Sequence, residues 1–151
     1  MIDRPDNPQD TSPAAAVAAE LRALVGKLRR RLREQASPGD FTPSQISVLQ
    51  RLERQGPATV SSLARAEGMR PQSMSATVAP LEAAGLLSGA PDPNDGRQTL
   101  LSLTDHCRRL LADGRAARQD WLTRTLQSRL SVAEQHQVAV AIELLKRLAG
   151  E

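Results

Sequence analysis

The feature that most constrains the fold of this chain is a pair of short helical segments that meet at a glycine. Thr59 can cap a helix over 61–67, and Gly68 breaks that helix. A second helix begins at Pro71 and ends before Gly85, a residue suited to the left-handed position just past a helix. Two helices joined by so tight a turn indicate a helix-turn-helix.

A stiff loop and an alternating run follow the second of these helices directly. The stretch 86–104, LLSGAPDPNDGRQTLLSLT, begins with two leucines and passes through Gly, Pro, Asp and Asn. Leu101 and Leu103 then alternate with polar residues, which is the period of a half-buried strand. Most hairpins only close a core, but a hairpin in this place predicts a wing with Arg97 at its tip.

Amphipathic helices flank this segment on both sides. Apolar residues at helical spacing predict a helix over 17–32 that ends at SPGD (37–40), and TPSQ (42–45) reads as the capped start of the next. A long helix is expected from Asp105 to about Leu130, and SVAE (131–134) is a capping box for the last one. One chain of this size cannot cover three long apolar stripes completely, so we expect a second copy to cover them.

The expected fold class is mainly α with a small β-hairpin wing: a winged helix-turn-helix with a helical dimerisation region from both chain ends. Its parts are a flexible polar arm (1–12), the dimerisation region (13–36 and 105–151) and a winged helix-turn-helix DNA-binding domain (40–104). No apolar run is long enough to cross a bilayer and the start lacks the regions of a signal peptide. We therefore expect a cytoplasmic protein with no membrane partner, and a single cysteine agrees with that compartment.

The net charge and the reactive side chains bear on two classes of function, nucleic-acid binding and catalysis. The formal net charge is only +3, and solvated helix faces explain it at least as well as phosphate binding does. The candidates for a nucleophile, a base or a metal ligand are His106, Cys107 and His136. Adjacent side chains on a helix point about 100° apart, which is too divergent for a dyad or a ligand pair. We expect no catalytic residue, no metal and no cofactor, and therefore not an enzyme.

Four motifs span the chain from the second expected helix to the last. They are FTPSQISVLQRLERQGPATVSSLA (41–64), LEAAGLLS (81–88), DPNDGRQTLLSLT (92–104) and RLSVAEQ (129–135). In these motifs the sequence resembles the MarR family of winged helix-turn-helix transcriptional regulators, and the third motif is the most specific. The resemblance implies a homodimer that binds a roughly palindromic operator and releases it when a small molecule or an oxidant shifts its two reading heads.

The arginine at the wing tip has two interpretations. The prolines and Asp95 hold the loop so that Arg97 projects, and a narrow, negative minor groove accepts a guanidinium. From the residues alone, an Arg97 that only bridges to Asp95 on a solvated loop fits equally well. The family resemblance favours insertion into the minor groove, with Asp95 orienting the arginine.

The second short helix carries the other predicted DNA contacts, opposite an inner face of Met74, Val78 and Leu81. These contacts are Arg70, Gln72, Ser73, Ser75, Ala76 and Thr77. A glutamine can read adenine with two hydrogen bonds, serine can serve several bases, and an alanine can approach a thymine methyl group. An arginine just before the helix can reach a phosphate or a guanine. The alternative is that these short side chains only face solvent.

The chain departs from the family pattern in having few cations on its predicted DNA surface. Ala79, Pro80, Ser88, Gly89 and Gly96 stand where related proteins tend to carry basic residues, or where such a residue is common. Fewer phosphate contacts predict weaker binding with a shallow salt dependence, and Pro80 is expected to kink its helix. The arginines within 29–33 either compensate by contacting the DNA backbone or simply charge the surface.

Cys107 invites an oxidant-sensing role, which the sequence argues against. Relatives usually have a glycine there, and Cys107 shares the helical face of Leu103, Leu110 and Leu111. A small buried thiol acts as an apolar filler, and burial suppresses the reactive thiolate. A packing role is therefore favoured over oxidant sensing.

The predicted function is that of a DNA-binding transcriptional regulator, with repression favoured. Its expected partners are double-stranded DNA, a second copy of the chain as a homodimer, and a small-molecule effector. The alternative is a winged-helix protein-interaction scaffold without sequence-specific DNA binding, which the charge-neutral middle segment would allow.

Overall fold

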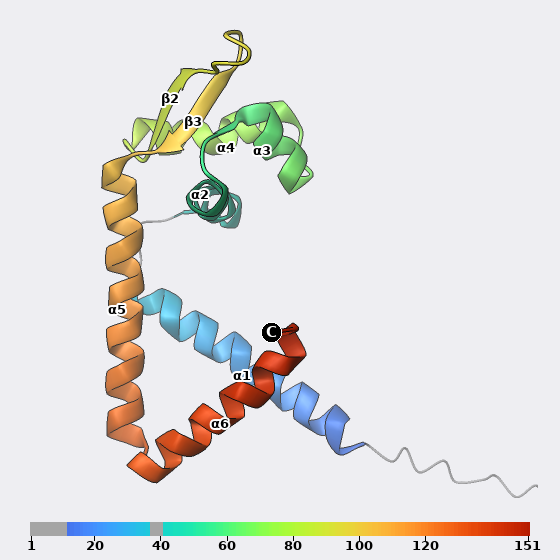
Figure 1. Cartoon of the computed structure of the whole chain (residues 1–151), viewed down its shortest axis with the longest axis vertical. Coiled ribbons are helices and arrows are strands. Elements are labelled where there is room, and N and C mark those ends of the chain that lie inside the picture. Colours follow the sequence, from blue (N-terminus) through green and yellow to red (C-terminus); the bar gives the residue numbers. More distant parts are fainter. Residues whose placement is uncertain (1–11, 37–40) are drawn as a thin grey trace, which may run out of the picture.

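The computed structural model describes residues 12–36 and 41–151, so the expected arm up to residue 11 and the stop signal at 37–40 lie outside the described residues. The elements are α1 (Pro13–Gln35), α2 (Pro43–Gln55), β1 (Ala58–Thr59), α3 (Val60–Glu67), α4 (Pro71–Ala83), β2 (Leu87–Pro91), β3 (Thr99–Leu103), α5 (Asp105–Arg129) and α6 (Val132–Ala149). Figure 1 shows α2, α3, α4 and the strands at one end of α5, with α1 and α6 further along it. We call residues 41–104 the head. The predicted winged, mainly helical architecture is confirmed, and no helix in the described ranges is long and apolar enough to span a membrane.

Side-chain caps set the helix starts that the sequence predicts. In α2, the Thr42 hydroxyl accepts from the backbone N–H of Gln45 and the Gln45 side chain accepts from the N–H of Thr42, at 3.2 and 2.9 Å. Ser131 and Glu134 form the same reciprocal pair at the start of α6. Thr59 caps α3, which begins at Val60, one residue earlier than predicted. These local bonds satisfy backbone donors that have no partner inside a helix.

The wing belongs to a three-stranded antiparallel sheet in the order β1-β3-β2. β2 pairs with β3 from Leu87 opposite Leu103 to Pro91 opposite Thr99, as a hairpin requires. β1 pairs with the other edge of β3, with Ala58 opposite Leu101. The sequence analysis missed β1 because a strand of two residues has no period to detect.

The hydrophobic core lies in the head. The buried side chains are Val48, Leu49, Leu52, Leu63, Ala64, Met74, Val78, Leu81, Leu86, Leu87, Leu101, Leu103 and Cys107. The inner face of α4 is as predicted, and α4 continues past Pro80 to Ala83. The burial of Cys107 anchors the first turns of α5 to the head, which fixes where the long helix starts.

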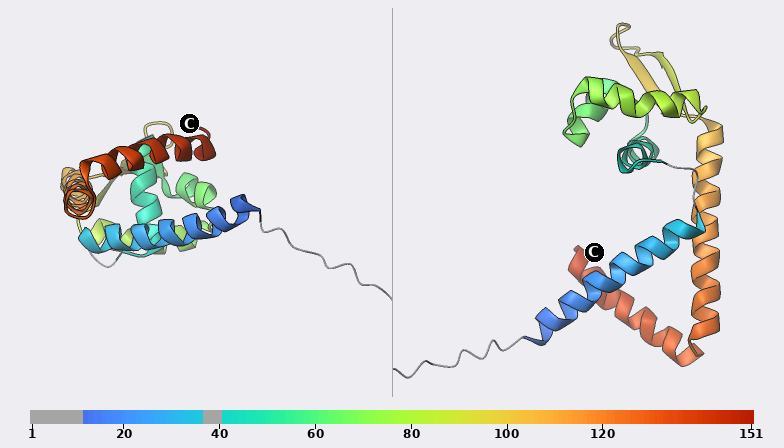
Figure 2. Two further views of the ribbon diagram at one scale, coloured as in Figure 1. Left: turned by 90° about the horizontal axis from the view of Figure 1, so that it is seen from below. Right: turned by 180° about the vertical axis from the view of Figure 1, so that it is seen from behind.

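The long helices hold few buried side chains in the single chain. Neither α1 nor α6 has a buried residue, and α5 has only Cys107. The apolar side chains exposed on α1 and α6 are Val17, Leu24, Val25, Leu28, Val132, Val140, Ile142, Leu144, Leu145 and Leu148. Both helices project from α5 in every view (Figure 1, Figure 2), and in Figure 1 they lie away from the end of α5 that carries the wing. Uncovered apolar surface of this extent is typical of an interaction site.

Candidate nucleic-acid interface

The outer face of α4 is exposed, and none of its side chains forms a salt bridge with a described residue. Arg70 stands at the N-cap position with an exposed side chain, and its side chain makes no capping hydrogen bond. Gln72, Ser73, Ser75 and Ala76 are exposed on the following turns. Short side chains let a helix approach base edges closely, and glutamine and serine offer both donors and acceptors there.

Thr77 differs from the other predicted contacts on α4, because it is half-buried and its groups are engaged within the head. Its hydroxyl donates to the carbonyl oxygen of Ser73 at 3.0 Å. Its own carbonyl accepts from the side chain of Gln45, at 3.4 Å. Gln45 therefore caps α2 and also joins α2 to α4, and Thr77 contributes mainly to holding the helix in place.

The half-buried carboxylate of Glu67 joins α2 to α3. Glu67 accepts from the Ser47 hydroxyl and from Arg51 Nε, both at 2.8 Å, so each carboxylate oxygen has a donor. These hydrogen bonds, with the charge of Arg51, hold the pKa of Glu67 below its ordinary value although burial acts the other way. The link fixes α3 against α2 and so fixes the turn that leads into α4.

The wing loop is held by its own backbone and by two aspartates. Asp92 Oδ1 accepts from the N–H of Asn94, and Asp95 Oδ1 accepts from the N–H of Arg97, at 3.0 and 3.1 Å. The N–H of Asp92 donates to the carbonyl of Gln98, which closes the loop. Among the described residues, no ion pair joins Asp95 to the Arg97 guanidinium. The expectation that Asp95 bridges or directly orients the guanidinium is corrected: Asp95 shapes the backbone instead, because an Asx turn uses the carboxylate for an amide.

Gly89 has a structural reason to lack a side chain. A Cβ atom built at this position would lie 2.6 Å from the methyl carbon of Thr99, its diagonal neighbour on β3. A basic side chain there would require Thr99 to move. The packing of the hairpin therefore disfavours a basic side chain at Gly89.

Thr104 joins the wing to the long helix. Its hydroxyl donates to the carbonyl oxygen of Gly85 at 2.7 Å and accepts from the N–H of Cys107 at 3.1 Å. Next to it, Cys107 is fully buried. Burial raises the pKa of the Cys107 thiol, the Glu53 carboxylate acts in the same direction and Arg108 acts against them. A thiol in this setting is a weak nucleophile.

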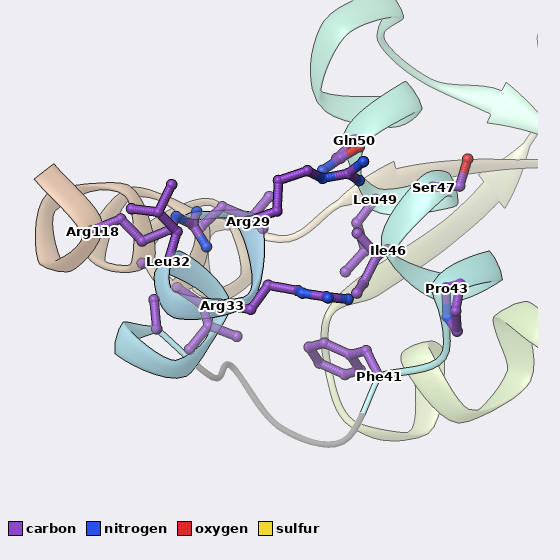
Figure 3. A pocket seen from close by; sticks show the side chains of 14 residues that line it. Arg29, Leu32, Arg33, Phe41, Pro43, Ile46, Ser47, Leu49, Gln50 and Arg118 are labelled. Carbon is purple, nitrogen blue, oxygen red and sulfur yellow. The ribbon is translucent and has the colours of Figure 1, made fainter. Parts of the chain in front are cut away.

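A cavity of about 780 Å³ lies between α1, α2 and α5. Its apolar lining includes Leu32, Phe41 and Ile46, and three arginines also line it: Arg29, Arg33 and Arg118. Figure 3 shows Arg29 reaching from α1 toward Gln50 and Arg33 reaching toward Ile46. None of the three arginines forms a salt bridge with a described residue. Apolar walls with a few convergent charges are typical of small-ligand pockets.

Comparison with known proteins decides the family. The MarR family profile matches residues 41–99, which lie within the head. An uncharacterised HTH-type transcriptional regulator of Mycobacterium bovis is 35% identical over 137 residues, which cover 91% of this chain and 95% of the relative. The chain belongs to the MarR family. This MarR-family chain is therefore a DNA-binding transcriptional regulator, and the family consists of regulators rather than enzymes.

Solved structures agree with this MarR-family assignment. A Pseudomonas aeruginosa protein described as a transcriptional regulator is 38% identical, has a TM-score of 0.75 and is matched over 97% of its length and 95% of this chain. A variant of MarR from E. coli has the same fold, at 24% identity and a TM-score of 0.65, with 95% of its length and 87% of this chain covered.

Sequence reasoning missed the cavity in this MarR-family protein. It assigned the arginines of 29–33 to the DNA backbone or to a solvated surface, whereas Arg29 and Arg33 line the cavity. Their spacing of four residues, on the same side as half-buried Leu32, was the available signal. Arg118 lies far along the chain, so only the packing of α1 against α5 brings the three together.

Proposed function

We propose that this regulator is a repressor that binds a palindromic operator as a homodimer and releases it when a small molecule fills the cavity. The proposed DNA contacts are Gln72, Ser73, Ser75 and Ala76 on α4, which Thr77 helps to hold in place, and Arg70 at its N-cap, with Arg97 inserted into the minor groove from a loop shaped by Asp95. The observation that carries the proposal is the exposed outer face of α4, together with a wing loop that Asp92 and Asp95 hold by hydrogen bonds and whose Arg97 has no salt-bridge partner among the described residues.

The apolar faces of α1 and α6 support the homodimer. Residues 13–36 and 105–151 act as the dimerisation region in this proposal, and residues 40–104 act as the DNA-binding domain. A two-fold dimer presents the same patch on both subunits, so one set of exposed apolar side chains covers the other. Two heads related by a two-fold axis read an inverted repeat whose half-sites are about one helical turn apart.

The chemistry of the cavity favours a small molecule over an oxidant as the signal. Leu32, Phe41 and Ile46 suit an apolar body, and Arg29, Arg33 and Arg118 suit an anionic group. The thiol of Cys107 is buried and has a raised pKa, which disfavours oxidation. The proposed effector is therefore a small amphipathic anion.

Selection of bound DNA tests the proposal. Sheared genomic DNA is passed over the immobilised protein at low salt, and the retained fragments are sequenced and then tested in a gel-shift assay. The expected result is enrichment of an inverted repeat that is bound as a dimer. Absence of any retained DNA at low salt would favour the protein-interaction scaffold and refute the proposal. A reporter strain that lacks the gene then distinguishes a repressor from an activator. Expression from the operator should rise in that strain if the protein is a repressor, and a fall would make it an activator.

A further inference from the structure

The head contacts the long helices through few polar groups. At the start of α5, the N–H of Cys107 donates to the Thr104 hydroxyl at 3.1 Å, and Arg108 Nη1 donates to the carbonyl oxygen of Leu103 at 2.7 Å. Past this first turn, one polar link between α5 and the head occurs within residues 41–151. It is the ion pair between Arg115 Nη1 and Glu53 Oε1, also at 2.7 Å.

The ion pair lies far along α5 from the contacts at its first turn, so a small change in its length changes the angle of the head. Arg115 lies eleven residues past Thr104, or about 16 Å along the helix axis at about 1.5 Å per residue. Between them, Cys107 is buried and Leu110 and Leu111 pack partly against the core. If one water entered the ion pair, the gap would widen by about 2.8 Å, which over that lever turns the head by about 10°.

The cavity lies along the same seam between α2 and α5. Leu49 and Gln50 on α2, and Leu111 and Gly114 on α5, line it. Glu53 is one helical turn past Leu49, and Arg115 directly follows Gly114. Any ligand that separates α2 from α5 in the cavity therefore pulls on the ion pair as well.

The ion pair is exposed enough to open. The Arg115 side chain is 55% exposed and the Glu53 side chain 32%. Exposed pairs of this kind add little to folding stability. Hinge motions are governed by small differences in free energy. A weak ion pair far from the hinge can therefore control the angle between the head and α5 although it adds little to the stability of the fold.

We propose that Glu53 and Arg115 are positioning residues whose ion pair sets the angle of the head on α5, with the first turn of α5 as the hinge. The inference rests on the proposed function in one respect: the angle matters for DNA because it sets the spacing of two heads on an operator. Filling of the cavity opens the pair and turns the head away from the angle seen here.

A distance measurement within one chain tests the inference. Spin labels are placed at Ala66→Cys on α3, a helix that lies on the side of the head away from α5 (Figure 1), and at Gln127→Cys, two residues before the end of α5. Both positions are exposed, and native Cys107 is fully buried. Labelled protein is diluted with unlabelled protein so that each assembly holds one labelled chain. Pulsed electron paramagnetic resonance then gives the distribution of distances between the labels.

Four variants are compared with the labelled parent. Arg115→Ala and Glu53→Gln should broaden or shift the distribution, and the charge-swapped double variant, Glu53→Arg with Arg115→Glu, should restore it. Arg124→Ala removes another exposed α5 arginine, one without a salt bridge to a described residue, and should match the parent. In the parent, high salt should shift the distance distribution toward that of the single variants, because salt screens an exposed ion pair.

The outcomes separate this inference from the proposed function. A parent-like distribution in Arg115→Ala, or a double variant as broad as the single ones, would overturn the inference whether or not the protein binds DNA. Failure to bind any DNA would refute the proposed function and leave the distance result intact. Where an operator is bound, Arg115→Ala should change its dissociation constant by no more than a factor of about five, the range expected for an exposed pair.

Discussion

Replacement of Arg97 by alanine isolates the contribution of the wing to DNA binding. The Arg97 side chain is exposed, and its backbone N–H, which alanine keeps, supplies the bond to Asp95. The guanidinium forms no salt bridge with a described residue. The substitution should therefore change the free energy of unfolding by less than about 0.5 kcal/mol, as is usual for a surface position. A change in DNA affinity then reports a contact with DNA rather than a damaged fold.

The salt dependence gives the size of the effect. Each cation withdrawn from DNA lowers the slope of log affinity against log salt by about 0.9, so a dimer that loses two arginines should lose about 1.8. Between about 50 and about 200 mM salt, a fourfold change, the advantage of the parent over the variant should shrink by about 12-fold. Fluorescence anisotropy with a labelled operator across that range measures both slopes.

Gln72→Ala is the matched control, because Gln72 is also exposed on the proposed DNA surface but carries no charge. It should keep the parent slope and lose preference at one base position, at a cost of about 1–3 kcal/mol. The reasoning is refuted if Arg97→Ala keeps the parent slope. It is also refuted if both variants weaken all sequences equally.

Three further predictions follow from the structure. Cys107→Ser should still bind the operator, and peroxide should release neither this variant nor the parent in a gel-shift assay; release of the parent alone would make the protein an oxidant sensor. Because the pKa of Glu67 is lowered in the folded state, its contribution to stability is full above the ordinary glutamate pKa of about 4.3 and is lost as the pH falls through the lower folded value. Urea unfolding from pH 6 to pH 3 should therefore show a flatter pH dependence in Glu67→Gln, with a stability loss of about 1–2 kcal/mol at neutral pH. Leu145→Glu on exposed α6 should halve the sedimenting mass, since a charge in an apolar dimer interface is costly; an unchanged mass would place the interface elsewhere.

Local signals in the sequence were sufficient for most of the fold. The capping residues Thr42, Thr59 and Ser131 act on donors within three residues of themselves, so their effect can be read from a short stretch. The inner face of α4 follows from helical spacing alone. The burial of Cys107 was also predicted, because its neighbours at helical spacing are leucines.

Features that join distant segments could not be predicted in this way. Two-residue β1 forms only because β3, about forty residues later, offers it a free edge. The carboxylate of Asp95 had two available partners, a guanidinium and an amide, and only the loop geometry selects the amide. The cavity needs α1, α2 and α5 together, so neither Arg29 nor Arg118 carries a sign of it in its own surroundings.

The scarcity of cations on the proposed DNA surface bears on how such a regulator could be released. Packing against Thr99 disfavours a cation at Gly89, and Arg70 and Arg97 are then the proposed cationic contacts on α4 and the wing. A head with few phosphate contacts binds weakly alone, so a dimer depends on engaging both half-sites at once. Under that condition a change in head angle that disengages one head removes most of the affinity. In the proposed mechanism, the weak, exposed Glu53–Arg115 pair shifts the balance between the two head angles by no more than a factor of about five, and the differential binding of the effector supplies the rest of the shift.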